Sequence, residues 1–278
     1  MRLISQLCRN FLGRAKSGFL PSLFDLAAGG DTEPDLKKLI IYNHAGVIAI
    51  NKPSGMISQG AYGDAFSIAK GLHQLPSKKW PDKHRLAHRL DRNTSGVVLI
   101  ARTKPVIRAL NEQFQQRSIR KEYWAIVDGV LGQESGFIDS PVPCPVKRDG
   151  KAKKVKKDAR TDFRVLGTSD FGVSFVHFKP HTGRYHQLRV HAARDLQTPM
   201  LGDQDYHPFY FYGAKKKNGN SVREFSATSI SPQIHADMGG QLLHARSITF
   251  HHPVLDEEVK IEAPLPPERA QIWAELGF

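Results

Sequence analysis

The sequence is poor in cysteine and lacks the short motifs that hold common cofactors. Its 278 residues include two cysteines, Cys8 and Cys144, which lie far apart in the chain. This usage argues against a disulfide scaffold and against a zinc site built from paired thiolates. The sequence also contains no phosphate-binding P-loop, no GxGxxG dinucleotide turn and no HExxH zinc helix. These absences give no support to a cofactor site of any of these kinds.

Long apolar runs are absent as well. No run approaches the roughly 20 residues that cross a bilayer, so we expect no membrane-spanning helix. Hydrophobic residues make up 40% of the chain and charged residues 24%, which are ordinary proportions for a globular protein. The length is enough for one large domain or two small ones with a sizeable core.

Acidic residues are scarce relative to basic ones. The 40 lysines and arginines outnumber the 27 aspartates and glutamates, which gives a net charge of +13. Such a surface attracts polyanions, and RNA is the first candidate partner. An acidic protein or an anionic membrane surface is the alternative. We favour RNA as the partner, without a membrane and without an obligatory protein partner.

The basic residues are densest at residues 147–157, whose sequence is KRDGKAKKVKK. The glycine and the lack of a periodic pattern predict a mobile loop or a hairpin tip. Because blocks of positive charge bind phosphate groups, we expect this segment to contact the RNA backbone. The residues assigned to that contact are Lys147, Lys151, Lys153 and Lys154. A solvated loop without a partner is the alternative.

The N-terminal segment contains no acidic residue before Asp25, although four basic residues precede it. This composition, rich in serine and leucine, is typical of a mitochondrial transit peptide. The alternative is a basic arm that contacts RNA in a bacterial or cytosolic protein. We expect residues 1–35 to form a basic N-terminal arm or a transit peptide. The location is mitochondrial in the second case and cytoplasmic in the first.

The segment HRLDRNTSG at residues 88–96 is the most informative stretch of the chain. It places Asp91 among two arginines and a histidine, and the apolar run VVLIA that follows predicts a buried strand. Asp91 is therefore expected on a loop just before a rigid core element, which is a common place for chemistry. The alternative is a turn aspartate in a surface salt bridge.

Hydrophobic patterns and turn residues predict more strands than helices. The expected strands are residues 39–42, 47–50, 97–101, 122–127, 171–180, 241–253 and 259–263. The expected helices are residues 65–73, a helix capped by Thr103, residues 183–196 and a short final helix. Many of the strands are connected as hairpins, so we predict an α+β fold with a largely antiparallel sheet. Residues 207–240 are polar with weak structural signals, which predicts an insertion.

The segment at residues 88–96 resembles the signature of the RluA-type pseudouridine synthases, which isomerise uridine in RNA. KPSG (52–55), RKEYWA (120–125) and TGRYHQLRVH (182–191) resemble further motifs of that family, in the family's order. LLHA (242–245) and FHHP (250–253) resemble its C-terminal core strands.

The resemblance implies a single mixed sheet with flanking helices and a central RNA-binding cleft, with the catalytic domain at residues 36–278. A separate S4-type RNA-binding module is not expected, because roughly 35 residues before the core are too few. The implied activity converts specific uridines of a structured ribosomal or transfer RNA to pseudouridine, by base flipping and without a cofactor. In this reading Asp91 is the nucleophile, Arg184 is the cation that pairs with it, and Tyr123 lies in the cleft.

The residues themselves support part of this assignment. An ionised carboxylate in a partly dry cleft is costly unless a cation pairs with it. If residues 183–196 are helical, Arg184, Leu188 and His191 share one face. Leu188 is then placed to press on the target uracil, and ordinary core packing is its alternative. Arg184 is alternatively an anchor of the helix start.

Tyr123 and Trp124 are neighbours on a predicted strand, so their rings point to opposite faces. One ring is expected in the core and the other in the cleft, and the pattern alone does not decide which. Arg89 lies two residues before Asp91 and shares its side if the stretch is extended. We expect Arg89 to fill the gap left by the extruded nucleotide or to bind its phosphate. The histidines at 186 and 191 are expected to be structural and not metal ligands.

Two other functions compete with an RNA-modifying enzyme. One is a non-catalytic RNA-binding or ribosome-assembly factor on the same fold, which the basic charge alone would equally explain. The other is a carboxylate-based hydrolase of nucleosides or glycosides. That hydrolase requires a second well-placed acid, and Glu122 and Asp203 are the candidates.

Overall fold

The computed structural model describes residues 34–60, 65–76, 84–148, 151–207 and 238–278, with the backbone alone at residues 147–148 and 151–152. From Asp35 to Phe278 the described residues belong to one compact unit. The expected arm at residues 1–35 lies outside the described residues except for its last two. The expected insertion at residues 207–240 likewise lies outside them except for its two ends.

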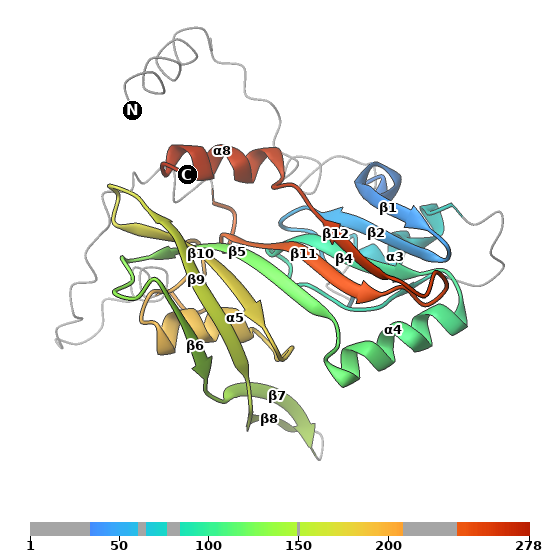
Figure 1. Ribbon diagram of the computed structural model, residues 1–278, viewed down its shortest axis with the longest axis horizontal. Helices are drawn as coiled ribbons and strands as arrows, with labels where there is room; N and C mark the ends of the chain where they lie inside the picture. The colour runs from blue at the N-terminus through green and yellow to red at the C-terminus, as the bar shows by residue number, and fades with distance from the viewer. Residues whose placement is uncertain (1–33, 61–64, 77–83, 149–150, 208–237) are drawn as a thin grey trace, which may run out of the picture. The chain divides into compact units, whose positions relative to one another are not determined.

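A ten-stranded sheet organises the described part of the chain (Figure 1). Along the sheet the strands are β1 (Ile40–His44), β2 (Val47–Lys52), β4 (Ser95–Ala101), β11 (Leu243–His251), β5 (Arg120–Asp128), β10 (Val173–Pro180), β9 (Arg160–Thr168) and β6 (Ser135–Asp139). Two more strands pair off this path, β12 (Glu258–Glu262) with β11 and β3 (Arg85–Leu86) with β4. Only the pairing of β4 with β11 is parallel among these strands. The prediction of an α+β fold with a mixed, largely antiparallel sheet is confirmed.

A separate two-stranded ribbon is formed by β7 (Val142–Arg148) and β8 (Lys151–Lys157). Within the basic run, residues 147–148 end β7 and residues 151–157 form β8, which pairs with β7 in antiparallel fashion. The tip predicted between them, at residues 149–150, lies outside the described residues. Lys153, Lys154, Lys156 and Lys157 are exposed on β8.

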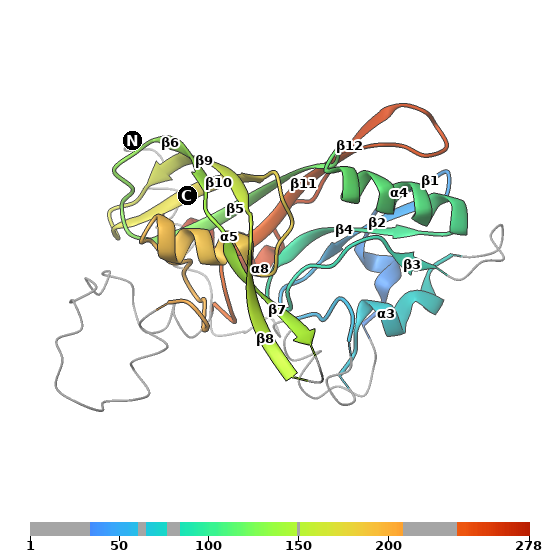
Figure 2. The ribbon, with the colours of Figure 1, turned by 90° about the horizontal axis from the view of Figure 1, so that it is seen from below.

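The helices are short and lie against the sheet. They are η1 (Leu36–Leu39), α3 (Ile68–Gly71) with η2 (Leu72–Gln74), α4 (Lys104–Gln116), α5 (Gln187–Val190) with the π-turn η3 (His191–Asp195), and α8 (Pro267–Glu275). Figure 2 shows α3 and α4 on opposite sides of the strands β2 and β4. None of the helices in the described ranges has the length and apolar character that crossing a bilayer requires.

The alternation of side chains along β4 places apolar residues on both faces of the sheet, so helices must pack against both faces. Val97 and Leu99 pack in one cluster with Val106 and Leu110 of α4. Val98 and Ile100 face the other way and pack with the residues of η1 and α3. A strand that is apolar at every position is buried on both sides, so the run after Asp91 forms a rigid central strand.

The other half of the sheet is covered by α5 and α8. Leu188 and Ala192 pack against Val127, Val176 and Phe178 in one cluster. Ile272 and Trp273 of α8 pack against Ile126 and Val173 in another. These two helices fix the ends of β5 and β10, the strands that flank the candidate site.

The prediction of a helix over residues 183–196 was wrong at its start. The helix begins at Gln187, and His186 before it has a left-handed backbone with φ of 50°. The side-chain oxygen of Gln187 accepts hydrogen bonds from Thr182 Oγ1 at 2.7 Å and from the Arg184 backbone at 3.0 Å. These bonds hold residues 182–186 as a turn. Arg184 therefore precedes the helix and does not share a helical face with Leu188 and His191.

Gly96 is the point of closest approach between the parallel strands β4 and β11. Its φ is +113°, and a Cβ built there would lie 2.2 Å from the carbonyl oxygen of Ala245. Only glycine accommodates both the backbone angle and the contact. The register of Asp91 relative to β11 depends on this contact.

We expect Gly96→Ala to lower the free energy of unfolding by about 3 kcal/mol, because of the clash and the unfavourable φ. The measurement is urea denaturation followed by circular dichroism. Gly132→Ala is the matched control, because a Cβ there meets nothing within 4 Å. The control should shift stability by no more than about 0.5 kcal/mol. Equal denaturation midpoints for the two variants would contradict the close approach.

Candidate active site

The loop that carries Asp91 is anchored from below by the buried residue Lys52. Its ammonium group donates to the backbone oxygens of Pro53 at 3.0 Å, Met56 at 2.8 Å and Arg92 at 2.8 Å. All three donors of the ammonium are therefore used by backbone acceptors. Burial lowers the pKa of Lys52 to about 7, and the charge of Asp91 opposes that shift. Lys52 supports the loop and does not reach the cleft.

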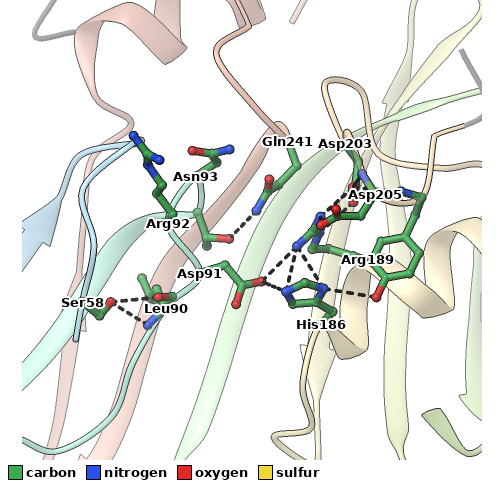
Figure 3. Close-up of polar contacts among 12 residues, drawn as sticks. Ser58, Leu90, Asp91, Arg92, Asn93, His186, Arg189, Asp203, Asp205 and Gln241 are labelled. Carbon is green, nitrogen blue, oxygen red and sulfur yellow. Dashed lines mark hydrogen bonds and ion pairs between the residues drawn. The ribbon is translucent and has the colours of Figure 1, made fainter. Parts of the chain in front are cut away.

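Further hydrogen bonds fix the two sides of Asp91. Ser58 Oγ donates to the Leu90 carbonyl at 2.8 Å and accepts from the Leu90 amide at 3.1 Å (Figure 3). Arg92 Nε donates to the Gly55 carbonyl at 3.1 Å. The backbone on each side of Asp91 is thus held, so its side chain has a defined direction.

His88 is a half-buried acceptor at the base of the same loop. Its Nε2 accepts a hydrogen bond from the Leu99 amide at 3.0 Å, and its ring lies 5.1 Å from that of Phe114. Burial lowers the pKa of His88 to about 3, and the positive charge of Lys121 adds to the effect. The imidazole is neutral at neutral pH, as an acceptor must be.

The carboxylate of Asp91 faces an arginine and a histidine. Its Oδ2 lies 3.6 Å from Nη1 of Arg189 and 3.7 Å from Nε2 of His186 (Figure 3). These separations allow charge attraction without a tight hydrogen bond. The side chain is 27% exposed, so its oxygens remain accessible from the cleft.

Arg189 is held in place by two carboxylates. Its Nε and Nη2 bind Asp203 at 2.7 and 2.6 Å, and Nη2 also lies 2.6 Å from Asp205. Burial by itself lowers the pKa of Arg189. The hydrogen bonds and charges of Asp203, Asp205 and Asp91 outweigh burial, so the pKa is raised above its usual value. Arg189 is a permanent and rigidly oriented cation.

Arg184 was predicted to pair with Asp91, and this pairing was wrong. Arg184 Nε donates instead to the Asp158 carbonyl at 2.9 Å, and Arg189 occupies the place beside Asp91. The pairing was inferred from the resemblance, which matched Arg184 with the arginine of the family's third motif, and that motif contains a second arginine, Arg189. The sequence does hold a signal for Arg189. An arginine between Leu188 and Val190, inside a buried apolar face, needs an acidic partner.

His186 is the second residue that sequence reasoning missed, because it was expected to be only structural. Its ring stacks on Tyr185 at 3.7 Å between centroids, and Nδ1 lies 3.1 Å from the Tyr206 hydroxyl. Burial lowers the pKa of His186, and the charge of Asp91 partly opposes this. Its left-handed backbone is the kind of strain that collects at functional sites, and no spacing pattern reveals it. His191, by contrast, bonds Thr161 and the Ser140 carbonyl and is structural, as expected.

Asp91 opens into a cleft of about 500 Å³. Five of the predicted site residues line it, namely Arg89, Asp91, Tyr123, Arg184 and Leu188. Asp91 is the single carboxylate among the described residues of this lining. The exposed Lys153 and Lys154 are not part of it, and the side chains of Lys147 and Lys151 lie outside the described residues.

Tyr123 provides an aromatic wall of the cleft. Burial raises the pKa of its hydroxyl, and the charge of Asp91 raises it further, so the phenol stays protonated. Trp124 lies on the other face of β5, in an edge-on contact with Phe175 at 5.5 Å and beside Arg246 at 4.8 Å. The two rings thus point to opposite faces, as the strand pattern predicts.

The second acid that a hydrolase needs is missing from the described cleft lining. Glu122 accepts from Ser247 Oγ at 3.0 Å and lies outside the cleft. Asp203 is fully buried and bound to Arg189. Within the described ranges, no three His, Cys, Asp or Glu side chains group as metal ligands. The arrangement offers one carboxylate, an aromatic face and several cations.

His88 makes the protein sensitive to acid. Its pKa is about 3 in the folded protein and about 6.5 in an unfolded chain. Between these values the unfolded chain binds a proton that the folded one excludes, so stability falls as pH drops from about 6.5. We expect His88→Gln, which keeps an acceptor but cannot titrate, to weaken this fall by up to about 1.4 kcal/mol per pH unit.

The measurement for His88 is urea denaturation at several pH values between 4.5 and 7. His73→Gln serves as the control, because His73 is an exposed histidine outside the cleft. Identical pH dependence in the wild type and His88→Gln would show that His88 does not stay neutral in the folded protein.

Comparison with known proteins places this geometry in a family. Residues 46–194 match the family model described as RNA pseudouridylate synthase. An uncharacterized RNA pseudouridine synthase of Zymomonas mobilis is 33% identical over 88% of this chain and 100% of its own length. The mitochondrial RNA pseudouridine synthase 4 of Arabidopsis thaliana is 32% identical over 82% of this chain and 57% of its own length.

Another curated relative and a solved structure support the same family. Ribosomal large subunit pseudouridine synthase C of Escherichia coli is 31% identical over 83% of this chain and 67% of its own length. The solved structure of human RNA Pseudouridylate Synthase Domain Containing 4 matches with a TM-score of 0.63 and 28% identity, covering 87% of this chain and 94% of that one. The chain therefore belongs to the RluA-type RNA pseudouridine synthases, which are isomerases.

Proposed function

We propose that Asp91 is the nucleophile with which this enzyme converts uridine to pseudouridine in a structured ribosomal or transfer RNA. The observation that carries the proposal is the position of Asp91, the single carboxylate in the described lining of the cleft, 3.6 Å from Arg189. A carboxylate is suited to attack on the anomeric carbon of a sugar.

The reaction needs no atoms from outside the substrate. A carboxylate oxygen of Asp91 bonds to C1′ as the N1–C1′ bond breaks, and the electron pair stays on the uracil. The uracil turns, C5 bonds to C1′, and the carboxylate leaves. The proton on C5 is then lost and N1 gains one, so uridine and pseudouridine have the same composition.

The distance between Arg189 and Asp91 suits this role. Arg189 is oriented by Asp203 and keeps its charge, which favours the ionised form of a nearby carboxylate. At 3.6 Å the pair is longer than a hydrogen bond, so an oxygen of Asp91 is not tied up in the ground state. Interactions that bind the ground state tightly do not accelerate the chemical step.

The remaining cleft residues are proposed to hold the uridine. Tyr123 stacks on the flipped uracil with a protonated hydroxyl, and Leu188 closes the cleft beside it. Arg89 is exposed at the cleft, where it fills the gap left by the flipped nucleotide or binds its phosphate. Residues 36–278 form the catalytic domain in this proposal.

Ribosomal RNA is the favoured substrate, with transfer RNA as the alternative. Several relatives are named ribosomal large subunit pseudouridine synthase C or D, and the net charge of +13 suits a large polyanion. The acid-free N-terminal segment and the mitochondrial relative support a mitochondrial location. A cytoplasmic location is the alternative.

We expect Asp91→Asn to lower pseudouridine formation by about four orders of magnitude or more, as loss of a nucleophile does. RNA affinity should stay within about threefold, because phosphate contacts dominate it. The measurement is site-resolved pseudouridine mapping in cells that lack the gene and carry either form. Asp170→Asn is the control, because Asp170 is exposed and outside the cleft. A full map restored by Asp91→Asn would support the non-catalytic RNA-binding factor instead.

We expect the exposed lysines of β8 to contribute to RNA affinity. Replacing Lys153, Lys154, Lys156 and Lys157 with glutamine should weaken binding and reduce the slope of log K against log salt by about 0.7 to 0.9 for each lost phosphate contact. The measurement is fluorescence anisotropy with labelled ribosomal RNA fragments at increasing KCl. An unaltered slope would show that the ribbon of β7 and β8 is not part of the RNA-binding surface.

A further inference from the structure

A second, smaller pocket of about 260 Å³ adjoins the catalytic cleft. Phe114, Lys121, Gly183 and Arg184 line both of them. The two recesses therefore adjoin each other, with Lys121 and Arg184 between them. The proposed reaction does not use this second pocket.

The charge of this pocket is of one sign. Four basic side chains line it, Arg117, Lys121, His181 and Arg184, and none of its lining residues is acidic. Of these, His181 has a carboxylate partner, Asp162, at 2.8 Å. Among the described residues, Arg117, Lys121 and Arg184 form no ion pair. The pocket is a concentration of uncompensated positive charge.

Lys121 is the least solvated of these cations. It lies on β5 two residues before Tyr123, so both side chains point to the same face of the strand. Its ammonium donates to the Thr182 carbonyl at 3.4 Å, which is a long hydrogen bond. Burial and, to a lesser extent, the neighbouring charge of Arg117 lower the pKa of Lys121 to about 8. An anion in the pocket would relieve both effects.

The two arginines complement Lys121. Arg184 Nε is used by the Asp158 carbonyl, which orients the guanidinium and leaves its terminal nitrogens without a partner in the described part of the chain. Arg117 ends α4 in a left-handed conformation with φ of 59°, and its side chain reaches the same pocket. Forked guanidinium groups and a compact ammonium are the donors that bind phosphate.

We infer that this pocket binds one backbone phosphate of the substrate RNA, next to the nucleotide whose base enters the cleft. The inference rests on the proposed function in taking RNA as the ligand. A nucleotide carries a phosphate on each side of its sugar, so a uridine at Asp91 brings phosphates to the edge of the cleft. The lining residues that it shares with the cleft, and a lining with basic but no acidic residues, make this pocket the place for one of them. Lys121 and Arg184 are binding residues in this assignment.

The test is the salt dependence of binding to a fluorescein-labelled 12-nucleotide oligouridylate, for the full chain and for Lys121→Met. Methionine keeps most of the length of the side chain and removes the charge. We expect affinity at low salt to fall about tenfold, as for a lost charged hydrogen bond. The slope of log K against log KCl should fall by about 0.7, the value for one phosphate contact on a single strand.

Two further variants control the measurement. Lys121→Arg retains the charge and should restore both the affinity and the slope. Lys38→Met removes an exposed lysine that lines none of the three pockets, and should change neither. If Lys121→Met does not fold, Arg117→Gln combined with Arg184→Gln tests the same pocket from two residues that are not core side chains. An unchanged slope in the variant that folds overturns the inference.

The phosphate site and the proposed function can be rejected independently of each other. In single-turnover assays on RNA, the Lys121→Met defect should appear mainly in the RNA concentration that gives half the maximal rate. A defect confined to the maximal rate would overturn the phosphate site, even if Asp91 is the nucleophile. Loss of affinity and slope in Lys121→Met, together with a wild type that forms no pseudouridine, would leave the site standing and reject the function.

Discussion

The ion pair between Arg189 and Asp203 is the interaction on which the rest of the site depends. Both side chains are almost completely buried, at 5% and 0% exposure. A buried pair of this kind stabilises a fold weakly, but removing one partner leaves a charge without compensation, which costs about 3 to 5 kcal/mol. Its importance here is that it fixes the orientation of the Arg189 guanidinium. Because Asp203 engages two nitrogens of Arg189, the remaining Nη1 is presented to Asp91 from a fixed position.

The sheet supplies the other half of that geometry. Asp91 precedes β4, whose contact with β11 is set by Gly96. Lys52 ties the loop, through the Arg92 carbonyl, to the carbonyls of Pro53 and Met56. Arg189 comes from α5, which packs on β5 and β10. The carboxylate and its cation therefore belong to different halves of the sheet. The 3.6 Å separation of Asp91 and Arg189 is therefore set by strand pairing and helix packing, and not by the conformation of a single short segment.

This division explains what the sequence could and could not predict. Alternating apolar residues identify the strands, and the same alternation sends Tyr123 and Trp124 to opposite faces. A local pattern, a charged loop before a buried strand, drew attention to Asp91, and the resemblance to the family signature assigned its role. Choosing Arg189 over Arg184 required the start of α5, and that start is set by hydrogen bonds that the Gln187 side-chain oxygen accepts from residues five and three positions earlier. The position of His186 depends on a left-handed backbone angle that no periodicity encodes.

Under the proposed function, the carboxylate of Asp91 and the RNA backbone compete for the same cations, because both are anionic. The cleft resolves this by separating the cations. Arg189 is enclosed by Asp203, Asp205 and Asp91, so its charge is already balanced and attracts phosphate weakly. Arg184 and Lys121 lack a carboxylate partner in the described residues, and both line the cleft as well as the basic pocket. The same segment, residues 182–191, thus supplies Arg189, whose charge is balanced by carboxylates, and Arg184, whose Nε binds only a backbone carbonyl among the described residues.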